Sequence, residues 1–129
     1  MIKVSNHYDS MFTDYQKNKL VVLDKPSNNL KLIDMSTLNP GDRVDGLISV
    51  NDIWSDPLYN RIGDITGKNV IGRVDSKGGF SYSDCDNIKL FLRPDGKLVT
   101  TKGNHRTLMK IGVDGHNSTI PAKIVVHDE

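Results

Sequence analysis

The sequence has little cysteine, few aromatic residues and almost no net charge, and these shortages exclude several classes of protein. A single cysteine, Cys85, leaves no partner for an internal disulfide and no set of thiolates for a zinc site. No stretch approaches the roughly 18 consecutive apolar residues of a membrane-spanning helix. The first ten residues also lack the apolar core of a signal peptide. We therefore expect a cytoplasmic protein that does not enter a membrane.

The charge balance limits the kind of partner that the chain can attract. Its 17 Lys and Arg residues stand against 16 Asp and Glu residues, which gives a formal net charge of +1. A positive field over the whole surface is thereby excluded, so any basic patch has to be local. The length of 129 residues suits one domain that buries a core without help from a metal.

The N-terminal region predicts an extension on a single domain. Aromatic and methionine side chains between positions 8 and 15 recur at helical spacing. Residues 1–18 therefore predict either a short amphipathic helix that packs on the body or a partly ordered arm. Residues 19–129 then form the single domain.

The middle of the chain carries short and mixed signals. Two apolar runs, 19–23 and 30–33, flank a dense cluster of turn residues and predict a β-hairpin. Apolar residues at roughly helical spacing predict one or two short helices between about 47 and 65. Residues 67–87 are rich in glycine, serine and aspartate and predict a long irregular loop, with a short strand at Val70 and Ile71.

The last third gives the clearest pattern. It predicts a strand at 88–92, a tight turn at Pro94–Lys97 and a returning strand at 98–101. A helix over about 104–111 follows and ends at Gly112, and a final strand covers 120–126. The whole pattern predicts an α+β fold: a small mixed β-sheet with a few short helices.

The junction between the second of these strands and the helix carries the strongest chemical signal. A glycine there lets the backbone approach a ligand, and the helix that follows offers unpaired N–H groups and the positive end of its dipole. Cationic donors surround the same point, and arginine can clamp a phosphate with two hydrogen bonds. The predicted phosphate-binding residues are Thr101, Lys102, Gly103, Asn104, His105 and Arg106.

The stretch LFLRPDGKLVTTKGNHRTLMKIGVDGHNSTIPAKIVVHD resembles the core of the ParB/sulfiredoxin-like superfamily. The resemblance covers about residues 88–127 and rests on a hairpin, a Gly-x-His-Arg junction, a helix and a closing strand that begins with Ile-Pro. A weaker likeness lies in LKLIDMSTLNPGDRV. The resemblance to this superfamily implies a ParB/sulfiredoxin-like core that binds CTP or ATP with Mg²⁺. Gly103, His105 and Arg106 match its motif directly.

The chain also departs from that family. Sulfiredoxins have a catalytic cysteine where Asn104 stands, and Cys85 lies outside the motif, so sulfiredoxin chemistry is not expected. ParB partition proteins continue past the closing strand into a DNA-binding region, whereas this sequence stops at Glu129. We therefore expect a minimal nucleotide-binding protein with a DNA-linked role of phage or plasmid type, without an assigned catalytic residue.

Two other functions remain open from the sequence. The first is a mobile-element interaction or inhibitor protein that keeps the fold and binds a host protein through the predicted 67–87 loop or the N-terminal arm. The second is a small metal-dependent nuclease, which needs a carboxylate cluster that the spacing does not show. The scattered histidines lack metal-ligand spacing, so no metal site is predicted.

Overall fold

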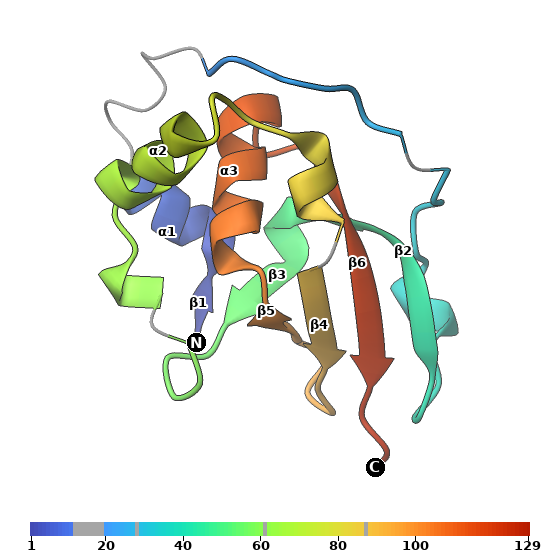
Figure 1. The fold of residues 1–129 in the computed structure, drawn as a ribbon. Helices are drawn as coiled ribbons and strands as arrows, with labels where there is room; N and C mark the ends of the chain where they lie inside the picture. Colours follow the sequence, from blue (N-terminus) through green and yellow to red (C-terminus); the bar gives the residue numbers. More distant parts are fainter. Residues whose placement is uncertain (12–19, 28, 61, 87) are drawn as a thin grey trace.

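A computed structural model describes residues 1–11, 20–27, 29–60, 62–86 and 88–129. Its centre is a six-stranded mixed sheet in the order β1-β3-β5-β4-β6-β2, with α3 packed across one face (Figure 1). The strands are β1 (Ile2–Lys3), β2 (Arg43–Ser49), β3 (Ile53–Ser55), β4 (Ile88–Leu92), β5 (Leu98–Lys102) and β6 (Thr119–Val126); the helices are α1 (Val4–Met11), α2 (Gly67–Ser76) and α3 (Asn104–Asp114). The predicted α+β fold with a small mixed sheet is confirmed.

Alternation along the strands shows which face of the sheet carries the core. In β4, Ile88, Leu90 and Leu92 are buried under the helices, while Lys89 and Phe91 between them point to the other side. The final strand β6 repeats this pattern. Such alternation is expected of a sheet with one packed face, because successive side chains of a strand point to opposite faces. We call the side that bears Lys89 and Phe91 the open face.

The core is formed between the sheet and the three helices. Leu108 and Ile111 of α3 are almost fully buried, and α2 adds Val70 and Val74 at a spacing of four residues. The N-terminal residues share this core: Val4 and Tyr8 of α1 are buried, and β1 pairs with β3. Positions 12–18 of the predicted extension lie outside the described residues.

The helices predicted between about 47 and 65 are wrong. That range holds the end of β2, a short 3-10 turn at Val50–Asp52, β3, and a second 3-10 turn at Ile62–Asp64. Apolar residues there fit helical spacing by sequence alone, but β2 pairs along its whole length with β6. The pairing across the sheet outweighs the local pattern, as tertiary context often does.

The long loop predicted at 67–87 is also wrong. Residues 67–76 form α2, and Tyr82–Cys85 forms a 3-10 turn. Val70 and Ile71, predicted as a strand, lie in α2. Glycines lower the helical propensity of this segment, but a capping box at Thr66 and the buried face of the helix offset that cost.

The hairpin predicted from 19–23 and 30–33 does not form between these two runs. Val22 bridges to Phe80 and Leu32 bridges to Leu47, so each run pairs elsewhere, and Lys19 lies outside the described residues. The second run passes so close to β2 that a Cβ on Gly46 would lie 2.4 Å from Ile33. The glycine therefore lets this segment cover the outer edge of β2.

The C-terminal third follows the sequence prediction closely. Its strands and the turn at Pro94–Lys97 form as expected, and Gly96 adopts the left-handed conformation that the turn requires. The helix runs past Gly112 and ends at Asp114, and the N–H of the following Gly115 donates to the carbonyl of Ile111. The longer helix buries Leu108, Met109 and Ile111, and this burial outweighs the low helical propensity of Gly112.

Candidate functional site

The junction between β5 and α3 is built around Gly103. Its φ is +125°, which side-chain-bearing residues rarely adopt, and a Cβ there would lie 2.5 Å from the Cγ2 atom of Ile88. Glycine thus allows the chain to turn from β5 into α3 while pressed against the start of β4. From the sequence we expect this glycine to let the backbone approach a ligand; in the structure its close neighbour is Ile88.

The two helices near this junction begin in different ways. The N-terminus of α2 is capped by its own residues, because Thr66 and Asn69 exchange hydrogen bonds in a capping box. The N-terminus of α3 begins at Gly103, which has no side chain to cap it, and no side-chain cap hydrogen bond is present. The first-turn N–H groups of α3 therefore receive no hydrogen bond from a capping side chain, and such groups are the ones that bind anions at helix N-termini.

A cleft of about 770 Å³ lies between α2 and the start of α3. Three of its side chains bear or can bear positive charge: Lys68 and Arg73 from α2, and His105 from the first turn of α3. The remaining lining residues are Asp64, Ile65, Asn69, Gly72 and Ser76. Two helices thus bring cationic groups to the cleft. One of these groups, His105, belongs to the first turn of α3, which has no side-chain cap.

The structure separates the six residues predicted to bind phosphate. His105 lines the cleft. The Asn104 side chain points back to the sheet, where its Oδ1 accepts a hydrogen bond from Thr100 and its Nδ2 donates to Ser55. Thr101 and Lys102 are exposed at the end of β5, and the Thr101 hydroxyl donates to the carbonyl of Lys89.

Arg106 is not among the residues that line the cleft. Burial raises the pKa of the Cys85 thiol, and the positive charge of Arg106 opposes this rise. Within the described ranges, the Arg106 Nη1 atom is buried and has no hydrogen-bond partner. Such a donor is costly unless a ligand or water completes it. The first turn of α3 therefore carries an unsatisfied cationic donor.

Sequence reasoning missed Lys68 and Arg73, because it assigned residues 67–87 to a loop. A usable signal was present. Thr66 and Asn69 have the spacing of a capping box, and Val70 and Val74 follow with the spacing of one buried helix face. In a helix that begins at this capping box, Lys68 and Arg73 lie outside the face formed by Val70 and Val74.

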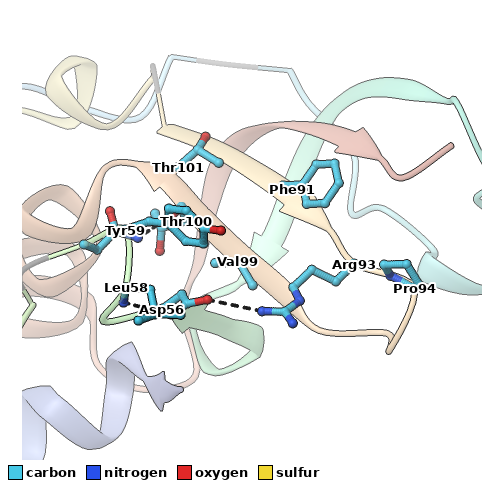
Figure 2. Close-up of a pocket in the computed structure, with 10 residues that line it drawn as sticks. Asp56, Leu58, Tyr59, Phe91, Arg93, Pro94, Val99, Thr100 and Thr101 are labelled. Atoms are coloured by element: carbon cyan, nitrogen blue, oxygen red, sulfur yellow. Dashed lines mark hydrogen bonds and ion pairs between the residues drawn. The ribbon is translucent and has the colours of Figure 1, made fainter. Parts of the chain in front are cut away.

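A second hollow lies on the open face of the sheet (Figure 2). It has a volume of about 660 Å³, with Phe91 and Val99 on the strands and Leu58 and Tyr59 on the loop that follows β3. An ion pair closes one end, with 3.3 Å between the Arg93 Nη1 atom and the Asp56 Oδ2 atom. This groove is on the other side of the sheet from α3 and is distinct from the α2–α3 cleft.

Among the residues that the structure describes, no group of three or more His, Cys, Asp or Glu side chains could hold a metal ion. None of the helices in the described ranges has the length and apolar character needed to cross a membrane.

The cleft makes protein stability depend on the protonation of His105. Burial lowers the pKa of His105 below its ordinary value of 6.5, and the nearby Arg73 charge lowers it further. The unfolded chain then binds this proton more tightly than the folded chain, so the free energy of unfolding falls as pH drops below about 6.5. We expect the wild type to lose more stability than His105→Gln between about pH 7 and about pH 5. Urea unfolding at the two pH values measures these losses. If the wild type and His105→Gln lose the same free energy of unfolding between them, the pKa of His105 is not lowered by folding.

Cys85 is expected to be unreactive in the folded protein. Its side chain is buried in the core, and burial raises the pKa of the thiol to about 12. At pH 8 about one thiol in ten thousand is then ionised, and the thiolate is the reactive form. A disulfide reagent should therefore label the native protein at least about 100-fold more slowly than the denatured protein. Labelling at the same rate in both states would show that the thiol is accessible.

These features define a small α+β domain with a cationic cleft between two helices. Comparison with models of known protein families, with curated proteins and with solved structures finds no match for the chain. The resemblance to the ParB/sulfiredoxin-like superfamily therefore stays a prediction that rests on the residues quoted above.

Proposed function

We propose that the chain binds a nucleotide, CTP or ATP, through its phosphates in the cleft between α2 and α3. The observation that carries this proposal is the meeting of Lys68, Arg73 and His105 beside a helix that begins without a side-chain cap. Helix N-termini and cationic donors are the groups that bind phosphate in proteins. The cleft volume of about 770 Å³ falls in the range of small-molecule sites.

The electrostatics of the cleft favour an anion over a neutral ligand. The pKa of His105 is lowered partly by Arg73, so two groups that repel each other as cations lie close together. A bound anion would offset this repulsion and favour the charged form of His105. Phosphate affinity should therefore increase as His105 becomes protonated.

The same cleft offers a place for the Mg²⁺ that accompanies a nucleotide triphosphate. Magnesium in proteins is commonly held by one or two carboxylates together with phosphate oxygens and water. Asp64 supplies one carboxylate at the cleft. The residues present fit this mode of binding, in which the nucleotide itself provides the remaining oxygen ligands.

A cytoplasmic, DNA-linked role of phage or plasmid type remains part of the proposal and rests on the family resemblance. The alternatives make different demands. A nuclease needs a metal and should stop working with a chelator. A host-protein inhibitor should tolerate the loss of the cleft cations. Its predicted interface is either the N-terminal arm or residues 67–87, whose described part forms α2 and the 3-10 turn at Tyr82–Cys85.

The proposal is tested by thermal unfolding with and without millimolar CTP, ATP and GTP, each with Mg²⁺. A ligand present at 100 times its dissociation constant adds about 2.7 kcal/mol to the free energy of unfolding. For a domain of this size that is about 10 °C in Tm. A shift with CTP or ATP supports the proposal, whereas no shift with any nucleotide favours the interaction protein.

A further inference from the structure

The strands carry a charge imbalance that the chain as a whole lacks. The whole sequence has 17 Lys and Arg residues and 16 Asp and Glu residues. The strands have one acidic residue, Asp45, against five cationic residues: Lys3, Arg43, Lys89, Lys102 and Lys123. Positive charge is therefore concentrated on the sheet, as expected of a local patch for a polyanion.

Strand register brings several of these cations together on the open face. Lys89 is directly paired with Lys123, and directly paired residues of neighbouring strands point to the same side. Arg43 pairs with Val125, which in turn pairs with Phe91. Two lysines directly opposite each other repel and lower stability. Asp45 of β2 pairs with Lys123 on its other side and offsets part of this repulsion. An anionic partner above Lys89 would relieve the rest.

Aromatic rings lie among these cations. Trp54 pairs with Val99, which pairs with Phe91, so both rings belong to the open face. The Nζ atoms of Lys97 and Lys3 lie 4.8 and 5.6 Å from the centre of the Trp54 ring.

Tyr59 adds a third ring at the rim of the open-face groove. Its side chain is 84% exposed, and Figure 2 shows it across the groove from Phe91. A large aromatic side chain exposed to this degree beside a second ring is available to stack on a flat ligand.

We infer that the open face binds single-stranded nucleic acid. Lysine and arginine side chains on a sheet neutralise the phosphates of a strand, and exposed rings stack on its unpaired bases. Duplex DNA keeps its bases stacked inside and offers nothing to Tyr59 and Phe91. An acidic protein would satisfy the cations and leave the rings without a role. The mixture of rings and cations therefore favours the single strand.

This inference does not depend on the proposed function. The nucleotide cleft is formed by α2 and α3 on the packed side of the sheet, while the open face is formed by the strands and the loop after β3. A variant of one site should keep the activity of the other, so the failure of either idea can be recognised separately.

The experiment uses the single tryptophan of the chain as a reporter. We would titrate the protein with an oligothymidylate and an oligouridylate of about 15 nucleotides and follow Trp54 fluorescence and the anisotropy of a labelled strand. Binding of either strand, with quenching of Trp54, is the expected result. The double variant Lys89→Ala/Lys123→Ala should weaken binding at least about tenfold and reduce the slope of log K against log salt by about 1.4.

Tyr59→Ala should weaken binding by about fivefold or more, because one stacked base is lost. The side chain is largely exposed, so this variant should fold normally. Lys25→Ala removes an exposed lysine outside the sheet and serves as the matched control with unchanged affinity. Affinities unaffected by the Lys89/Lys123 and Tyr59 variants would overturn the inference. So would tighter binding of a duplex of the same length, or of polyglutamate.

Discussion

Replacing Gly103 with alanine should lower the free energy of unfolding by about 4 kcal/mol. Two costs combine. The backbone at this position has φ +125°, and the new Cβ would lie 2.5 Å from Cγ2 and 3.2 Å from Cα of Ile88. Because one of these atoms belongs to the backbone, the contact is not relieved by a side-chain rotation alone. Thermal unfolding should show a fall in Tm of about 15 °C.

Gly96→Ala is the matched control for this prediction. Gly96 also has a positive φ, +84°, but nothing lies within 4 Å of its added Cβ. This variant should lose about 1 kcal/mol from the unfavourable backbone conformation alone. The difference between the two variants then measures the close approach of the junction to β4. Equal losses would mean that the β5–α3 junction is not pressed against Ile88.

Removing the cations of the α2–α3 cleft should abolish nucleotide binding. Hydrogen bonds to charged groups contribute about 1.5 to 3 kcal/mol each, so Lys68→Ala or Arg73→Ala should weaken binding at least about tenfold. The double variant should show no nucleotide-induced rise in Tm at millimolar ligand. Arg73→Lys keeps the charge but loses the planar two-point contact, and an intermediate affinity is expected.

Lys77→Ala provides the control for charge. Lys77 follows the last residue of α2, is exposed and pairs with Asp84 at 3.2 Å, outside the cleft. The variant changes the net charge as much as Lys68→Ala does, so a general field effect would weaken binding equally in both. A site-specific contact predicts unchanged affinity for Lys77→Ala. Nucleotide binding that survives the double cleft variant would place the phosphates elsewhere.

The C-terminal third could be predicted because its signals are local. Proline and glycine in the turn at Pro94–Lys97 fix a hairpin by their own backbone preferences. The alternation in β4 and β6 reflects burial on one face, which a sequence shows directly. Gly103 could be identified as a junction for the same reason, although its neighbour Ile88 could not be inferred.

The cleft could not be predicted because it depends on contacts between distant segments. Lys68 and His105 come from helices far apart in the sequence, and the glycines in α2 concealed one of those helices. In the same way, β2 and β3 have apolar residues at helical spacing and become strands by pairing with β6 and β5. The open face could not be predicted, because its lysines and aromatic rings come together only through the pairing of separate strands.

Amide chemical shifts report where on the chain a nucleotide binds. A ¹⁵N-labelled protein would be titrated with CTP and ATP in the presence of Mg²⁺, and its ¹H–¹⁵N spectrum followed. We expect the largest shifts on His105 and its neighbours in the first turn of α3 and on Lys68 and Arg73 in α2. Shifts confined to the open face of the sheet, or spectra that do not change with either nucleotide, would contradict this expectation.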